Sequence, residues 1–443
     1  MSTHKYPTEK LKSWGKAKEL MKQYYRDYAT AHERGGVRWA GGAEGIDAIP
    51  AGLGDDVYPL KGEPYGASVA LDPKFALRCH EATEEKGYAR DLCAYMRNYW
   101  GSILLNEYAF GGPFPKPDFL WQFHLCCSHG KWYQEASRLE GGVPYYCVDW
   151  SSGFYYGWDE SIGQYQPAPK EHQIQYLVDQ MQEGIEWLEK VTGRTYDDEK
   201  LIRAVYNSCE STSLWAQICE LNKTIPAPLA EKSMFSFYGI ASLQKSKKEF
   251  VEFYRELKDE VQDRVDRGIA ALANEKVRVM TDIQPPWGFL NIFRYLEEFG
   301  CVSIGSLFSF ALMGMWQIEK NGTLKGRETP LSKGMEIKDR AQALRIIADW
   351  DLSQFMATIF YTHKMKSNLM IKIAKQWHCD GAILHYNRGC EGFSMGIAEN
   401  RMALADSGIP VMSYEGNMGD EREFDLPGTK DRIDTFMETL GVK

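Results

Sequence analysis

Short apolar segments alternate with segments of helical periodicity in two separate parts of the chain. In the first part, apolar runs at residues 118–125 and 143–148 flank a helix that we expect over 131–139. The second part repeats this alternation, with runs at 276–283, 381–385 and 409–414 and helices expected at 289–299, 364–377 and 394–407. Strand–helix–strand order is typical of parallel sheets, because two parallel strands need a long crossover between them. The sequence therefore predicts an α/β protein with two flavodoxin-like or Rossmann-like parallel sheets.

Much of the remaining chain reads as helix. Residues 35–54, which are rich in glycine, are expected to form turns. Apolar residues recur at helical spacing over 9–35, 73–105, 170–222 and 246–275. A length of 443 residues exceeds what one hydrophobic core normally supports, so several domains are expected. We divide the chain into an N-terminal helical segment (1–50), a first α/β domain (51–165), a helical region (166–275) and a second α/β domain (276–443).

The composition argues against several classes of function. The net charge of −9 disfavours general nucleic-acid binding, which requires a basic surface. No apolar run approaches the roughly 20 residues that a membrane-spanning helix needs. The first residues lack the apolar core of a signal peptide. We therefore expect a cytoplasmic protein that binds neither nucleic acid nor membrane.

Ten cysteines are distributed along the chain without any Cys-x-x-Cys pair. In a cytoplasmic protein of this size we expect reduced thiols, most of them small buried hydrophobes. Three of them have a different context. Cys126 and Cys390 each follow an expected strand and precede an expected helix, and Cys93 lies inside the helical stretch 73–105. Because ligands gather at the carboxyl ends of parallel strands, where helix N-termini stabilise thiolates, Cys126 and Cys390 are candidate metal ligands. Cys93 is the third candidate.

The sequence around these cysteines contains a distinctive set of motifs. Residues 385–390 read His-Tyr-Asn-Arg-Gly-Cys, followed by Gly-Ile-Pro-Val at 408–411 and Glu-Gly-Asn-Met-Gly-Asp at 415–420. Together with the other cysteine contexts, this run resembles the family of 2-hydroxyacyl-CoA dehydratase and benzoyl-CoA reductase subunits. The opening Tyr-Pro-Thr-Glu-Lys-Leu at 6–11 and the Cys-Cys-Ser-His-Gly-Lys-Trp-Tyr loop at 126–133 are most similar to the larger cluster-binding subunit of ATP-dependent benzoyl-CoA reductase.

That resemblance implies one 4Fe-4S cluster held by Cys93, Cys126 and Cys390. It also implies a paired cluster-binding subunit and a separate ATPase dimer, which carries a further 4Fe-4S cluster and passes on electrons from ferredoxin. The implied reaction is the ATP-dependent reduction of benzoyl-CoA to a cyclic dienoyl-CoA in anaerobic aromatic degradation. Cys127 competes with Cys126 for the second ligand position, and the family's order of Cys, any residue, then Ser or Thr favours Cys126.

Three cysteine ligands leave one iron of such a cluster without a protein ligand, open to water or substrate. The tasks left to the protein are to hold the thioester, to exclude water and to supply a proton. His124, His129 and His385 lie near the motifs and are candidate proton donors. His129 is preferred, because it lies between the cysteine pair and Lys131.

Two other functions stay open on the sequence. A 2-hydroxyacyl-CoA dehydratase subunit, which belongs to a radical lyase, would use the same scaffold, with the open iron binding the substrate hydroxyl. A zinc-bound or metal-free scaffold subunit, which only carries partners, would use the cysteines without redox chemistry.

Overall fold

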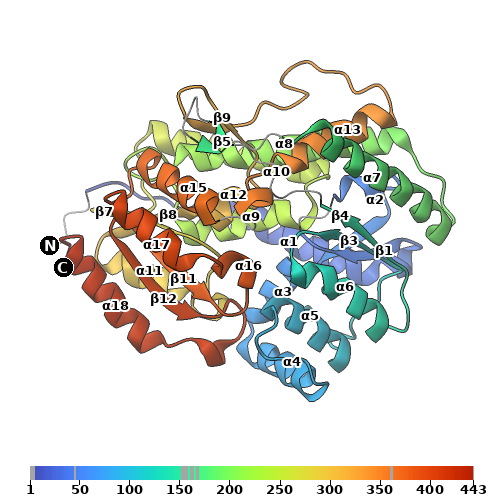
Figure 1. The fold of residues 1–443 in the computed structure, drawn as a ribbon, viewed down its shortest axis with the longest axis horizontal. Coiled ribbons are helices and arrows are strands. Elements are labelled where there is room, and N and C mark those ends of the chain that lie inside the picture. Colours follow the sequence, from blue (N-terminus) through green and yellow to red (C-terminus); the bar gives the residue numbers. More distant parts are fainter. Residues whose placement is uncertain are drawn as a thin grey trace.

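The computed structural model contains two four-stranded sheets, one in each half of the chain (Figure 1). The described residues are 5–43, 46–150, 158–159, 164–165, 169–359 and 363–442. The first sheet has the order β2-β1-β3-β4, with β1 at Val37–Gly41, β2 at Val57–Lys61, β3 at Phe119–His124 and β4 at Tyr145–Asp149. The second has the order β12-β11-β7-β8, with β7 at Val277–Thr281, β8 at Cys301–Ser306, β11 at Gly381–Asn387 and β12 at Val411–Gly416. All neighbouring strands in both sheets are parallel, which confirms the expected fold class.

Both sheets have the same topology. Numbered by their order in the chain, the strands of each sheet are arranged 2-1-3-4. This matches the start of the flavodoxin-like order, in which the direction of winding reverses between strands 1 and 3. The crevice at that reversal lies beyond the carboxyl ends of β1 and β3 in the first sheet and of β7 and β11 in the second. In open α/β sheets this crevice is the usual place for a ligand.

Helices pack around both sheets and join them. Those near the first sheet are α2 (Ala48–Ala51), α3 (Gly62–Ala70), α4 (Pro73–Glu85), α5 (Ala94–Leu105) and α6 (Cys127–Leu139). Those of the second half are α11 (Asn291–Glu298), α12 (Leu307–Ala311), α14 (Met356–Ile359), α15 (His363–Gln376), α16 (Glu391–Ser394), α17 (Ile397–Asp406) and α18 (Leu426–Thr439). The helices at the top of Figure 1 are α7 (Glu171–Thr192), α8 (Asp198–Leu221), α10 (Lys248–Asp266) and α13 (Arg340–Leu352).

Helix α9 (Glu231–Gln244) contacts β2 of the first sheet and β8 of the second, so it bridges the two sheets. Helix α1 (Ser13–Thr30) packs against α9 and α10, which places the N-terminal helix beside the helical region. The short elements are η1 (Ala31–Arg34), η2 (Trp287–Phe289), η3 (Glu421–Glu423), β5 (Trp158–Asp159), β6 (Gln164–Tyr165), β9 (Trp316–Ile318) and β10 (Leu324–Gly326).

Several elements differ from the expectation. Strand β1 lies in the glycine-rich passage, so the first sheet begins before residue 51, while the division into domains stays a prediction. The helix expected over 73–105 is two helices, because Gly87 (φ +87°) follows α4 and non-helical backbone at Cys93 begins α5. Cys93 therefore lies at the start of a helix and not inside one. Gly193 (φ +66°) likewise separates α7 from α8, and neither α9 nor β8 was expected.

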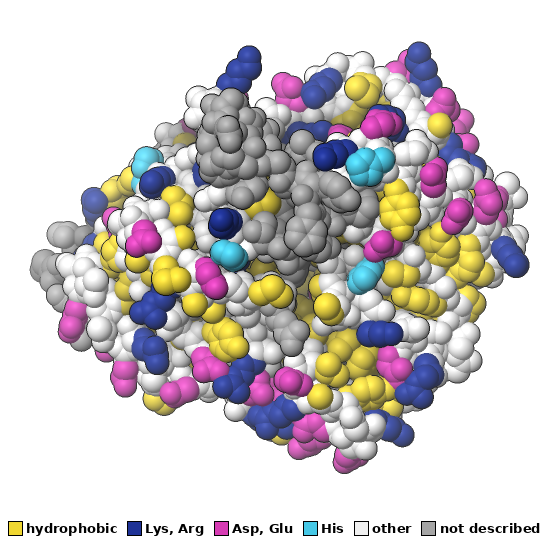
Figure 2. All heavy atoms as spheres, in the orientation of Figure 1, with side chains coloured by type: hydrophobic (Ala, Val, Ile, Leu, Met, Phe, Trp, Pro, Cys, Tyr) yellow, Lys and Arg dark blue, Asp and Glu magenta, His cyan; other side chains and the backbone are white. Residues whose placement is uncertain are grey.

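Charged side chains of both signs are interspersed on the surface. On the face shown in Figure 2, the described Lys and Arg side chains are interspersed with Asp and Glu. In the described parts of the chain, no helix is long and apolar enough to cross a membrane.

Gly101 in α5 lies against Cys79 in α4. A Cβ at residue 101 would lie 2.4 Å from Cys79 Cα, too close without a backbone shift. We expect Gly101→Ala to lower the free energy of unfolding by about 1–3 kcal/mol, the usual cost of overpacking a core. Urea denaturation measures this change. Gly15→Ala is the control, because a Cβ there has no neighbour within 4 Å, and an equal loss in both variants would contradict the packing argument.

Glu231, at the start of α9, is buried against the second sheet. Thr281 Oγ1 donates to Glu231 Oε1 at 2.6 Å, and Ser303 donates to Glu231 Oε2. Burial raises the pKa of Glu231 from its ordinary 4.5 to about 7, although the hydroxyls of Ser303 and Thr281 oppose that shift. The folded chain therefore keeps a proton that the unfolded chain releases at lower pH.

As the pH rises from 4.5 to about 7, this group is expected to lower the free energy of unfolding, because the unfolded state loses its proton first. The total loss is roughly 3 kcal/mol and is complete above that window. Glu231→Gln lacks the titrating group, so we expect it to lose less stability than wild type between those pH values. Urea denaturation across the window measures the difference. Glu256→Gln, at an exposed carboxyl on α10, is the control, and a Glu231→Gln profile parallel to wild type would refute the assignment.

Candidate functional site

A cavity of about 200 Å³ lies between the carboxyl ends of the two sheets. From the first half of the chain it is lined by residues after β1, β2 and β3, together with the start of α5. From the second half it is lined by residues after β7, β8, β11 and β12. Tyr238 of α9 also contributes to the wall. The cavity therefore occupies the crevices that both topologies create.

Three of the cysteines that line this cavity come from different loops. Cys93 precedes α5, Cys126 lies between β3 and α6, and Cys390 follows β11. Backbone N–H groups near each sulfur lower the pKa of its thiol, which favours a thiolate or the sulfur of a bound metal centre. These groups belong to Tyr95 and Met96 for Cys93, to Ser128 and His129 for Cys126, and to Phe393 for Cys390.

The three thiols differ in their electrostatic surroundings. Burial, and then the neighbouring Cys390 and Cys126 thiols, raise the pKa of Cys93. Burial raises the pKa of Cys390 to about 11. Burial acts in the same direction on Cys126, but the charge and hydrogen bond of His129 outweigh it and lower the pKa of Cys126. Without a metal, Cys126 is therefore the most acidic of the three.

His129 connects Cys126 to a buried carboxylate. Its Nδ1 lies 3.3 Å from Cys126 Sγ, and its Nε2 contacts Glu63 Oε1. Glu63 Oε2 also accepts the backbone N–H of Ala43 at 2.7 Å. Burial favours the neutral form of both groups, but the charge of His129 outweighs it at Glu63 and lowers that pKa, and the charges of Cys126 and Glu63 outweigh it at His129 and raise that pKa. A thiol, an imidazole and a carboxyl group therefore lie in a row on the cavity wall, and their mutual attraction favours the charged form of each.

The other candidates from the sequence have different places. Cys127 lines the cavity but is exposed. His124 is exposed and pairs with a surface carboxylate at 3.2 Å. His385 is buried, its Nδ1 lies 2.8 Å from the Gln284 carbonyl oxygen, and burial lowers its pKa to about 4. Of the three candidate histidines, His129 is the one that lines the cavity.

Two further residues of the wall, Glu63 and Gln284, were not expected from the sequence. Gln284 Nε2 donates to Cys390 Sγ over 3.8 Å. Each follows a strand, Glu63 after β2 and Gln284 after β7. The rule that selected Cys126 and Cys390 at strand ends could have found Gln284, because its strand was expected. Strand β2 was not expected, so no sequence signal pointed to Glu63.

In the parts of the chain that are described, no three His, Cys, Asp or Glu side chains lie close enough to bind one ion. All ten cysteines are free of disulfide bonds. Cys93, Cys126 and Cys390 border one cavity, and cysteine thiolates are the usual ligands of iron–sulfur clusters. Cys93, Cys126 and Cys390 are therefore the residues that could hold such a cluster.

The chain is similar to several known proteins. The family model described as 2-hydroxyglutaryl-CoA dehydratase, D-component, matches residues 56–440, a range that includes all three cysteines. The (R)-2-hydroxyisocaproyl-CoA dehydratase alpha subunit of Clostridioides difficile is 26% identical over 432 residues, which cover 95% of this chain and 94% of that protein. The (R)-phenyllactyl-CoA dehydratase alpha subunit of Clostridium sporogenes is 24% identical over 87% of this chain and 85% of its own length. A benzoyl-CoA reductase subunit of Thauera aromatica is 23% identical over 81% of this chain and 79% of its own length.

Proposed function

Because the chain belongs to the 2-hydroxyglutaryl-CoA dehydratase D-component family, we propose that it is the iron–sulfur subunit of an enzyme that reduces an aromatic CoA thioester. The specific reaction proposed is that of an ATP-dependent benzoyl-CoA reductase, which converts benzoyl-CoA to a cyclic dienoyl-CoA. The observation that carries the proposal is the convergence of three thiols from three loops on one apolar cavity.

Cys93, Cys126 and Cys390 are the proposed ligands of one 4Fe-4S cluster. Cys126 is preferred to Cys127, because Cys126 Sγ lies 3.3 Å from His129 Nδ1 while Cys127 is exposed. The backbone N–H groups around the three sulfurs favour their charged form, and the apolar wall excludes water. When bound, such a cluster supplies single electrons of low potential.

The cavity wall suits an uncharged, apolar acyl group. Its aromatic side chains are Tyr95, Trp132, Tyr238, Phe308 and Phe393. Lys and Arg are absent from the described residues that line it. An acyl group with a distal carboxylate would lose its hydration there without gaining a Lys or Arg partner, and His129 already pairs with Glu63. A benzoyl ring gains contacts with the aromatic walls and loses little hydration.

His129 is the proposed source of the proton that must accompany the electron. Its imidazole lines the cavity, and the negative charges of Cys126 and Glu63 favour its protonated form. The pair with Glu63 holds this proton on the wall of a site from which the apolar side chains exclude water. A general acid within reach of the substrate meets the requirement for proton transfer.

The proposed partners are a paired cluster-binding subunit and an ATPase dimer with its own 4Fe-4S cluster, reduced by ferredoxin. The similar proteins support this, because each is named as one subunit of its enzyme. Breaking the aromaticity of a ring requires an electron of very low potential, so coupling its delivery to ATP hydrolysis on a partner is chemically reasonable.

A second candidate is a 2-hydroxyacyl-CoA dehydratase subunit. Two of the similar proteins carry that name, and the alignment with the Clostridioides difficile protein spans 95% of this chain and 94% of that protein. The apolar wall also suits the alkyl or phenyl side chain of an uncharged 2-hydroxyacyl group. The two candidates differ in whether the electron is consumed or returned at the end of each turnover.

Product analysis separates these candidates. The anaerobic chain is combined with its paired subunit, its ATPase partner, ATP and a reductant, and is given benzoyl-CoA or (R)-phenyllactyl-CoA in separate reactions. We expect benzoyl-CoA to yield a cyclic dienoyl-CoA, with electrons consumed in proportion to product. Turnover of the hydroxyacyl thioester alone, with no net electron consumption, would establish the dehydratase and refute the reductase.

Iron and sulfide analysis tests the ligand assignment and the metal-free alternative. We expect about four iron and four sulfide per wild-type chain. Cys93→Ser, Cys126→Ser and Cys390→Ser are each expected to lose most of both, because each removes one of three protein ligands. Cys127→Ser and Cys301→Ser serve as matched controls and are expected to keep wild-type iron. Loss of iron in Cys127→Ser but not in Cys126→Ser would exchange these two assignments.

A further inference from the structure

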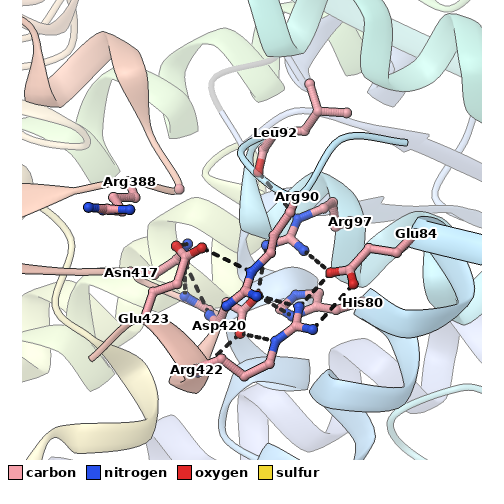
Figure 3. Close-up of polar contacts among 12 residues, drawn as sticks. His80, Glu84, Arg90, Leu92, Arg97, Arg388, Asn417, Asp420, Arg422 and Glu423 are labelled. Atoms are coloured by element: carbon pink, nitrogen blue, oxygen red, sulfur yellow. Dashed lines mark hydrogen bonds and ion pairs between the residues drawn. The ribbon is translucent and has the colours of Figure 1, made fainter. Parts of the chain in front are cut away.

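A compact network of charged side chains joins α4 and α5 of the first half of the chain to the loop after β12 of the second half (Figure 3). Asp420, in the loop after β12, lies at its centre. Arg97 of α5 donates to Asp420 Oδ2 at 3.1 Å, and Arg422 donates to the same oxygen at 2.7 Å. Both guanidinium groups also bond Glu84 of α4, at 3.2 and 2.5 Å. His80 Nδ1 lies 3.3 Å from Asp420 Oδ2, without the alignment of a hydrogen bond.

The centre of this network is buried. The side chains of Arg97, His80 and Asp420 are 0%, 1% and 2% exposed. Burial opposes the charge of Asp420, but hydrogen bonds from Arg422, the neighbouring His80 and then the charge of Arg97 outweigh it, so the pKa of Asp420 is lowered. Two carboxylates therefore balance two guanidinium groups. Removing the Asp420 charge would leave Arg97 buried without its main partner, which is strongly unfavourable.

One end of the network fixes the Cys93 loop. Arg97 lies one helical turn after Cys93, and its N–H donates to the Cys93 carbonyl oxygen at 3.0 Å. Its Nε also donates to the Leu92 carbonyl oxygen at 3.3 Å. The same guanidinium group thus holds both the residue before Cys93 and the carboxylate of Asp420.

The other end fixes the Cys390 loop. Asn417 Oδ1 accepts the backbone N–H of Asp420 at 3.1 Å. Asn387 Oδ1 accepts the N–H groups of Gly389 at 3.0 Å and of Met418 at 3.1 Å, which ties the Cys390 loop to the loop that carries Asp420.

A backbone hydrogen bond also joins the two cysteine loops directly. The N–H of Ala94, the residue after Cys93, donates to the carbonyl oxygen of Gly389, the residue before Cys390, at 3.3 Å. This single bond between two loops from different sheets has no support from a strand or helix ladder. Its geometry depends on how firmly the surrounding loops are held.

We propose that Asp420 is a positioning residue that fixes the Cys93 loop relative to the Cys390 loop. The inference rests on the proposed function, in which those two cysteines hold one cluster. Asp420 is not among the residues that line the cavity, so it acts through Arg97 and the loop backbone. Because the charges of the network balance one another, the network stays buried and holds the two loops in place. The folded chain therefore fixes the distance between the Cys93 and Cys390 thiols before any metal binds.

Hydrogen exchange of the metal-free full-length chain tests the proposal. In Asp420→Asn we expect amide exchange in peptides covering residues 92–97 and 387–390 to quicken by about tenfold or more, because the buried pair no longer holds these loops. Glu275→Gln is the matched control. It breaks another buried pair, in which Arg278 Nε donates to Glu275 at 2.6 Å with both side chains at most 4% exposed. General destabilisation affects both variants, whereas only Asp420→Asn is expected to loosen both cysteine loops.

Wild-type exchange at both loops in Asp420→Asn, or equal loosening in Glu275→Gln, overturns the proposal. If Asp420→Asn does not fold, Arg422→Gln is used, because Arg422 is 28% exposed and its loss leaves Arg97 paired with Asp420. That variant is expected to show the same change to a smaller degree, and no change would equally overturn the proposal. The exchange measurement needs no iron, so its outcome does not depend on the proposed function. If the wild-type chain binds no iron, the proposed function is refuted, but the exchange experiment still tests the role of Asp420.

Anaerobic reconstitution provides the second readout. After addition of iron and sulfide, Asp420→Asn is expected to retain less than about half of the wild-type iron and to show an altered electron paramagnetic resonance signal, because its thiols are no longer held in place. Glu275→Gln is expected to keep the wild-type signal. A wild-type signal and iron content in Asp420→Asn would show that the cysteine loops need no positioning by this carboxylate.

Discussion

The polarity of parallel strands is the constraint on which the rest of this structure depends. Every strand of a parallel sheet ends at the same edge, so its loops collect on one side. Here two sheets with the same 2-1-3-4 arrangement turn those edges toward one cavity. Loops that are far apart in the chain therefore meet, as those of Cys93 and Cys390 do. The bridging helix α9, which contacts β2 and β8, supports that relative placement.

Burial of charge is the second constraint, and it gives the three thiols different pKa values. An apolar site favours neutral thiols, as the raised pKa values of Cys93 and Cys390 indicate. Cys126 is the exception, because His129 supplies a compensating charge and Glu63 in turn supports His129. The proposed cluster would require thiolates, so its binding would release protons from the two neutral thiols. The same apolar wall that makes this costly also excludes water from the site.

Local periodicity was sufficient to predict part of the fold. Strands β3, β4, β7, β11 and β12 are short, largely apolar runs next to helical stretches, and all were expected close to their observed positions. Strand β1 lies among glycines, and β8 contains Gly305 and Ser306 in an apolar stretch that fits helix or strand equally well. The cysteines were found because motifs mark them in sequence. The partners of those loops were not, because Glu63 lies 66 residues from His129 and Arg97 lies 323 residues from Asp420.

Glycines allow the two cysteine loops to approach closely, and the buried charges then hold them together. A Cβ at Gly389 would lie 2.6 Å from Asn417 Oδ1, so only glycine lets that amide approach the Cys390 loop. A Cβ at Gly419 would lie 3.1 Å from Ala94 Cβ, beside the start of α5. Side chains at either place would separate the loops whose backbones meet at Ala94 and Gly389. Close backbone approach sets how near the two cysteine loops lie, and the buried charges of Asp420 and Arg97 keep them from moving apart. The motif from Glu415 to Asp420 thus has a structural role beside the cavity even though its carboxylates do not line it.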